Sequence, residues 1–307
     1  VAFVRGLAFH ERSASAVGAR TLLRVDACYA AAIGLLLVNP MLAAEPLARH
    51  LHLALEAGEP SRAARALAFE AVFTGLRSGP GAATDRLLER ARRIEQRMAD
   101  PQLTGLVRLC EGTVAQVSAR FRRAHELMIE SESVLSRRGV GVALEIDMVR
   151  LRRTDLLWNL GEMAELSRFA PALVDEARER GNRYMEMMVQ LSAGSLIGLA
   201  EGRPDRAREA VAAALERWPH AACIHSRGLM VYVNRALCEA WRGPRSDLIG
   251  RPVLDLVAPR DREMVARRVR DLYSGAAVEP YLRRAADAAT PGLPLPGACL
   301  SCLGGCP

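Results

Sequence analysis

Three cysteines near the end of the printed sequence have the clearest metal-ligand spacing: Cys299, Cys302 and Cys306. Three thiolates at this spacing could hold a zinc ion if a fourth ligand came from elsewhere. The surrounding segment is rich in glycine and proline, has no second cysteine pair and has no histidine nearby. We therefore expect no metal site, although zinc binding by this terminal cluster stays an open alternative. The other cysteines lie singly in apolar contexts, which is typical of small buried residues; they are Cys28, Cys110, Cys223 and Cys238.

The sequence lacks the motifs of phosphoryl-transfer enzymes. It contains no lysine, so it has no P-loop, whose lysine contacts nucleotide phosphates. The His-Arg-Asp and Asp-Phe-Gly motifs of protein kinases are missing as well. No local pattern suggests a Ser/His/Asp set, and His50 and His52, two residues apart, point to different faces of a helix. We therefore expect no enzymatic activity, no catalytic residue and no cofactor.

The positive charge of the chain does not by itself indicate a nucleic-acid partner. The formal net charge is +7, and all 42 basic residues are arginines. Six Arg-Arg pairs are spread along the chain, and acidic residues lie near most of them, which is typical of solvated helix faces. The longest apolar run, 27–38, is shorter than the roughly 20 residues of a membrane-spanning helix. We expect a cytoplasmic protein that binds neither nucleic acid nor a membrane.

The elements that must position any functional residues are mostly helices. Alanine, leucine and arginine dominate the first 219 residues and favour helix. Proline and glycine punctuate the pattern, as at Pro60, Pro101, Gly161 and Gly202. The predicted helices cover 19–38, 40–57, 60–77, 83–99, 101–117, 120–137, 142–160, 162–180, 183–200 and 204–217.

The helix breaks repeat along the chain. The spacings from Gly139 to Gly181 and from Gly161 to Gly202 give a period of about 41 residues, or two helices. Similar stretches starting at Glu59, Arg120, Gly161 and Gly202 are interpreted as openings of second helices. This pattern predicts an α-solenoid of antiparallel helix pairs, related to tetratricopeptide (TPR) arrays, over 1–219.

The pattern changes after residue 219. Residues 223–233 predict a β-hairpin with a Ser-Arg-Gly turn, because 229–233 is rich in strand-forming residues. Short helices are expected to follow, with a longer one over 259–274. From about 285 to 307 the chain has neither a helical nor a strand period, and we expect this tail to be disordered.

The stretches 228–236 and 248–262 resemble the first half of a PAS domain. Asn234 stands where that family caps a helix after its second strand, and Ile249-Gly250, Pro259 and Asp261 match its turns. The resemblance covers 222–284 and implies a small α/β sensor. After a candidate third strand at 281–284 no further strand pair can be read, so the resemblance implies an incomplete PAS-like domain.

Residues 1–219 resemble the helical region of large multidomain bacterial serine/threonine protein kinases. There the region lies downstream of a kinase domain and a P-loop ATPase-like module. The resemblance is carried by 20–26, 50–60, 100–105 and 141–147. It implies a regulatory or partner-binding role, without kinase activity in this chain.

Together these features predict a mainly α protein with a small, incomplete α/β segment at its C-terminal side. We expect a non-catalytic regulatory or protein-interaction module of a bacterial signal-transduction protein. Its partners would be proteins or other domains of that signalling protein, with dimerisation through 222–284 left open. The residues expected to line a partner groove are Arg150, Arg153, Tyr184 and Gln190. The alternative is a fragment of a larger serine/threonine protein kinase or sensor histidine kinase whose catalytic domain lies outside this chain.

Overall fold

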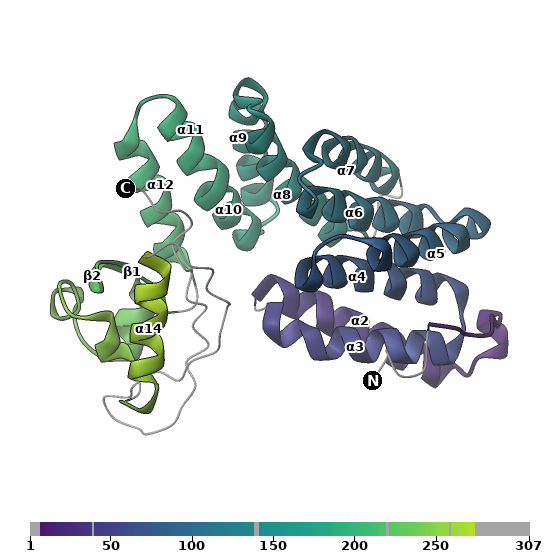
Figure 1. The fold of residues 1–307 in the computed structure, drawn as a ribbon. Helices are drawn as coiled ribbons and strands as arrows, with labels where there is room; N and C mark the ends of the chain where they lie inside the picture. Colours follow the sequence, from purple (N-terminus) through teal and green to yellow (C-terminus); the bar gives the residue numbers. More distant parts are fainter. Residues whose placement is uncertain (1–6, 39, 138–140, 219–220, 258, 274–307) are drawn as a thin grey trace. The chain divides into compact units, whose positions relative to one another are not determined.

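The computed structural model is mainly helical with one small two-stranded sheet among the residues it describes (Figure 1). The described residues are 7–38, 40–137, 141–218, 221–257 and 259–273. The chain divides into two compact units, Val1–Ile197 and Gly198–Pro307. The prediction of a mainly α protein is therefore confirmed.

The first unit is a succession of helices that match the predicted segments. After a short 3-10 turn, Ala14–Ala16, they are α2 (Ala19–Val38), α3 (Pro40–Ala57), α4 (Pro60–Ser78), α5 (Ala82–Met98), α6 (Pro101–Val117), α7 (Phe121–Ser136), α8 (Ala143–Leu160), α9 (Met163–Glu179) and α10 (Arg183–Val189). A π-helical turn, Gln190–Gly194, follows α10 and leads into α11 (Ser195–Ala200).

Local chemistry explains where these helices begin and end. The Glu59 side chain accepts hydrogen bonds from the backbone N–H groups at the start of α4, and Asp100 does the same for α6. Pro60 and Pro101 occupy first-turn positions, where a backbone N–H has no partner within the helix. Gly161, in the left-handed region at φ 75°, ends α8.

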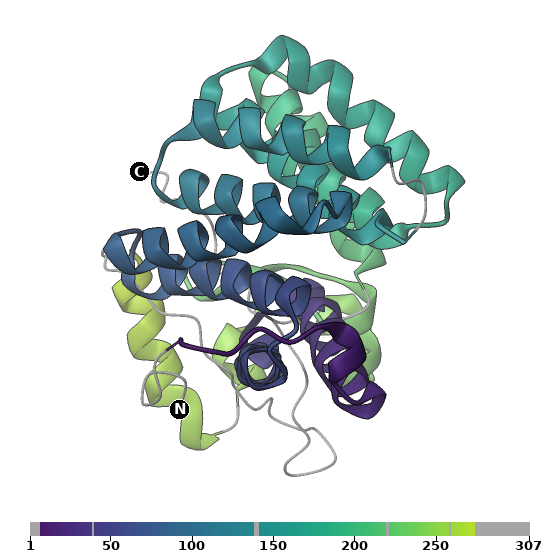
Figure 2. The ribbon, with the colours of Figure 1, turned by 90° about the vertical axis from the view of Figure 1, so that its right-hand side faces the viewer.

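Successive helices of the first unit pack side by side: α2 with α3, α4 with α5 and α6 with α7 form the most extensive pairs, and α8 packs on both α7 and α9 (Figures 1 and 2). Helix α4 also packs on α6, and α6 on α8. We call α2, α4, α6 and α8 the first-helix row. Since α4 contacts α5 and α6 more extensively than α3, the stretch at Glu59 opens a first helix and not the predicted second one. First and second helices share the same proline and small-residue openings, so the pattern could not separate them.

Small residues let α6 and α7 approach closely. A Cβ placed on Gly105 would lie 2.5 Å from Cγ of Leu135, so any larger residue there would force the buried Leu135 side chain to shift. The Ser131 hydroxyl donates a hydrogen bond to the Gly105 carbonyl oxygen at 2.6 Å across the same contact. The apolar interior continues from α2 to α8, because Met148 of α8 packs against both the cluster built on α2–α6 and the cluster built on α6–α8.

The second unit contains the predicted hairpin. Strand β1 (Cys223–Ser226) pairs antiparallel with β2 (Leu229–Val233), with Cys223 opposite Val233. Arg227 and Gly228 both have positive φ, which is the geometry of a tight hairpin turn. The elements that follow are α13 (Arg235–Trp241), three short 3-10 turns and α14 (Arg262–Tyr273). The hairpin, α13 and the 3-10 turn Val253–Leu256 share one apolar core, formed by Met230, Val233, Leu237, Leu248, Val253 and Leu256.

Helix α12 (Pro204–Arg217) belongs to this second unit. The buried Asn234 side chain donates hydrogen bonds to the carbonyl oxygens of Leu215 and Trp218. The Tyr232 hydroxyl lies 2.8 Å from Glu216 Oε2. The predicted boundary at 219–222 therefore falls inside the second unit. The predicted third strand at 281–284 and tail at 285–307 lie outside the described residues.

Candidate functional site

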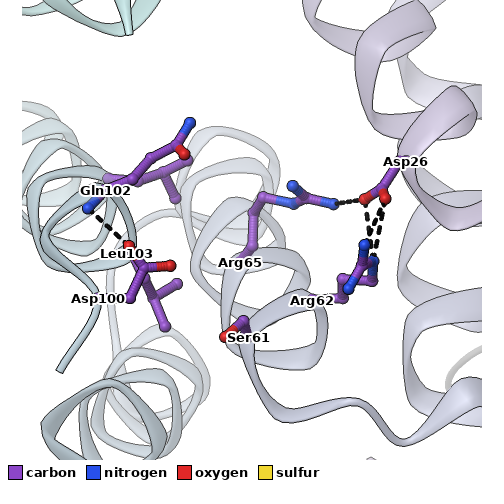
Figure 3. A pocket seen from close by; sticks show the side chains of 8 residues that line it. Asp26, Ser61, Arg62, Arg65, Asp100, Gln102 and Leu103 are labelled. Atoms are coloured by element: carbon purple, nitrogen blue, oxygen red, sulfur yellow. Dashed lines mark hydrogen bonds and ion pairs between the residues drawn. The ribbon is translucent and has the colours of Figure 1, made fainter. Parts of the chain in front are cut away.

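A pocket of about 300 Å³ lies on the first-helix row, between α2, α4 and α6 (Figure 3). Its lining combines charged, amide, hydroxyl and aliphatic side chains: Asp26, Ser61, Arg62, Arg65, Asp100, Gln102, Leu103 and Leu106. The arginines lie at i and i+3 of α4, so they share one face of that helix.

The centre of the site is a carboxylate shared by two guanidinium groups. Arg62 Nη2 lies 2.6 Å from Asp26 Oδ2, and Arg65 Nη2 lies 2.7 Å from Asp26 Oδ1 (Figure 3). Burial by itself would raise the pKa of Asp26, but the hydrogen bonds and positive charges of Arg62 and Arg65 hold it below its usual value. Asp26 is therefore ionised at neutral pH.

A second carboxylate fixes Arg62 in place. Glu59 is 5 % exposed and accepts hydrogen bonds from the backbone N–H groups of Ser61 and Arg62. Its Oε2 also accepts from Arg62 Nη1 at 3.0 Å. The cap of α4 thus orients the Arg62 side chain, because one carboxylate binds both the helix end and the guanidinium.

Arg65 also stacks on an aromatic ring. Its guanidinium carbon lies 4.0 Å from the centroid of the Tyr29 ring. Among the described residues, Arg65 Nε is buried without a hydrogen-bond partner, and Asp26 is the acceptor bonded to its Nη2. Arg65 therefore keeps donor capacity that the surrounding protein does not use.

A buried histidine lies next to the Tyr29 ring. His50 of α3 is 1 % exposed, its ring is 5.4 Å from that of Tyr29, and neither of its nitrogens has a partner among the described residues. Burial, followed by the positive charge of Arg65, lowers the pKa of His50 to about 3. The His50 ring is therefore neutral at physiological pH, so it packs in the interior and adds no charge to the site.

The opposite wall comes from the start of α6. The Asp100 carboxylate accepts from the Gln102 backbone N–H at 2.9 Å, which orders this turn (Figure 3). Gln102 Nε2 donates to Glu145 Oε1 of α8 at 3.3 Å, leaving the Gln102 carbonyl oxygen as an acceptor. Leu103 and Leu106 add an aliphatic surface. The pocket can thus accommodate a polar group beside an apolar one.

The predicted groove residues Arg150 and Arg153 lie away from this pocket and are paired within the protein. Arg150 Nε is 2.7 Å from Glu132 Oε1, and its Nη1 is 2.7 Å from Glu176 Oε1. Arg153 Nη1 is 2.6 Å from Glu132 Oε2, and its guanidinium carbon lies 4.3 Å from the Phe169 ring centroid. These side chains, 19 % and 14 % exposed, tie α8 to α7 and α9.

The other two predicted residues follow on α10 and the π-helical turn. Tyr184 is half-buried, and this burial raises its pKa. Gln190 begins the π-helical turn, and its Oε1 is buried without a partner among the described residues. The structure brings neither residue to the pocket.

Sequence reasoning missed the residues that do line the pocket. The one local signal was the pair Arg62 and Arg65, which follow the Glu59-Pro60 opening at helical spacing. Their carboxylate partner, Asp26, is 36 residues earlier than Arg62, on another helix. No pattern in the sequence predicts that contact.

The part of the chain that the structure describes shows neither a metal-binding cluster nor a membrane-spanning helix. It contains no group of three or more His, Cys, Asp or Glu side chains that could hold a metal ion. The predicted cysteine cluster at Cys299, Cys302 and Cys306 lies outside that part. Among the described helices, none has the length and apolar character needed to cross a bilayer.

Comparison with known proteins gives no relative for this chain. No protein-family model matches it, and no curated protein or solved structure is significantly similar to it.

Proposed function

We propose that this chain is a non-catalytic regulatory module of a bacterial signal-transduction protein. In this proposal the helix pairs form a TPR-like α-solenoid that docks a protein partner or another domain of the same signalling protein. The segment 222–284 is a partial PAS-like element that receives input or mediates dimerisation. The protein acts in the cytoplasm, and neither nucleic acid nor a membrane is its partner.

The observation that carries the proposal is the polar pocket between α2, α4 and α6. The residues that line it supply hydrogen-bond donors, acceptors and an aliphatic surface, which is what recognition of a peptide side chain requires. Ser61 is the one hydroxyl among the lining residues, and no histidine or lysine lines the pocket with it. The two lining carboxylates are already bound, Asp26 to the arginines and Asp100 to the Gln102 backbone N–H. The arrangement therefore favours binding over bond-making chemistry.

The packing of the first unit supports the same conclusion. In the proposed solenoid each helix pair buries its apolar side against the next; the apolar cluster shared by α2 to α6, and a pocket lined by α2, α4 and α6, support this arrangement. Stacked helix pairs of this kind give rigid surfaces for extended peptides or helices.

Site-specific photo-crosslinking tests the proposal. A photoreactive phenylalanine analogue replaces Gln102 in the pocket or, as the control, the exposed Arg86 on α5. We expect a discrete crosslinked protein from position 102 in cells of the source bacterium, absent from position 86. The added change Arg65→Gln should abolish that crosslink. Identical crosslinks from both positions would contradict docking at the pocket.

A further inference from the structure

The two carboxylates beside the arginine pair differ in how they are held. Glu59 is buried and bound to the backbone of α4, so it is a fixed part of that helix. Asp26 is 38 % exposed, and its hydrogen bonds in the described structure go only to the side chains of Arg62 and Arg65. Asp26 can therefore leave the guanidinium groups without breaking a helix cap.

Both arginines keep their positions if Asp26 leaves. Arg62 remains bound to Glu59, and Arg65 remains stacked on Tyr29. Arg62, Arg65, Glu59 and Asp26 sum to zero; without Asp26 the other three sum to +1, which the Asp100 carboxylate on the opposite wall of the pocket balances. The arginine pair is thus preorganised to bind one carboxylate. Asp26 occupies this binding position in the free protein.

We infer that Asp26 is an internal competitor for the pocket, and that a glutamate or aspartate side chain of a protein partner displaces it from Arg65. The inference rests on the proposed docking function and names the chemistry of the docked group. Asp26 itself shows that the arginine pair accepts a side-chain carboxylate. Leu103 and Leu106 favour an aliphatic residue next to that acidic residue.

The experiment titrates the whole chain with two blocked tripeptides, acetyl-Leu-Glu-Leu-amide and acetyl-Leu-Gln-Leu-amide. Binding is followed by the arginine Nε–Hε signals in ¹H–¹⁵N NMR spectra. We expect the Arg65 signal to shift with the glutamate peptide and not with the glutamine peptide. Equal shifts with both peptides, or no shift with either, would overturn the inference.

The decisive result is whether the change Asp26→Asn raises or lowers the affinity for the glutamate peptide. Asp26→Asn should tighten binding of the glutamate peptide about tenfold, because it removes the competitor, whereas Arg65→Gln should abolish it. Glu89→Gln is the matched control, since it removes the same charge from exposed pairs on α5. If Asp26→Asn and Glu89→Gln change the affinity equally, the effect is one of net charge and the inference fails.

A substitute variant and the crosslinking experiment complete the test. Asp26→Ser replaces Asp26→Asn if the latter does not give a folded protein by NMR, with the same expected tightening. The tripeptide experiment needs no natural partner, so its failure leaves the crosslinking result at position 102 unaffected. A crosslinked partner segment without acidic residues would refute the acidic ligand while leaving the docking function intact.

Discussion

The buried His50 should make the stability of the first unit depend on pH between pH 7 and pH 5. The pKa of His50 falls from the ordinary 6.5 to about 3 in the folded protein. The unfolded chain therefore takes up a proton below pH 6.5 that the native ring does not accept until about pH 3. Since the unfolded state binds more protons, the free energy of unfolding must decrease as the pH falls through this window.

The size of the effect follows from the two pKa values. Between pH 7 and pH 5 the native ring stays neutral, while the unfolded histidine goes from mostly neutral to almost fully protonated. Integrating this difference gives a loss of about 2 kcal/mol from His50 alone. His50→Leu removes the titrating group and two unpartnered buried nitrogens, so the variant should lose about 2 kcal/mol less than the wild type over the same interval.

Urea unfolding at pH 7 and pH 5, followed by circular dichroism, measures this difference. The control is His52→Leu, because the His52 side chain is 51 % exposed and two residues away on the same helix. It should keep the wild-type pH dependence. An NMR titration supplies the direct check, with the His50 ring expected to stay neutral at pH 5. Equal pH dependence in wild type and His50→Leu, or a His50 titration near 6.5, would refute the reasoning.

Two further predictions concern close packing and a buried amide. Gly105→Ala should lower the free energy of unfolding by about 1–3 kcal/mol, because its Cβ would meet Leu135. Gly34→Ala is the control, because a Cβ on Gly34 would meet no atom within 4 Å; it should leave the free energy of unfolding unchanged or raise it in the same urea titration. Asn234→Ala should cost about 3 kcal/mol, since this fully buried side chain caps α13 and bonds to α12 and the segment before β1. Faster proteolysis of the second unit would report that loss, whereas Asn159→Ala, at an exposed position, should leave the rate unchanged.

The sequence alone determined the secondary structure closely. Helix boundaries depend on the chain next to them: proline in a first turn, a capping carboxylate such as Glu59, or a glycine such as Gly161 that can adopt positive φ. The hairpin at 223–233 was readable for the same reason, because its turn and its strand-forming residues are adjacent. These are local interactions, and local patterns predict them.

The tertiary structure decided which charged residues meet. Arg150 and Arg153, expected to line a partner groove, form ion pairs with glutamates of neighbouring helices, and Arg62 and Arg65 line the pocket with Asp26. The sequence shows each arginine as a long cationic side chain on a helix, and a helix face can pack against a neighbour or face solvent. Only the packing of α2, α4 and α6 brings the Asp26 carboxylate and the two guanidinium groups of Arg62 and Arg65 to the same pocket.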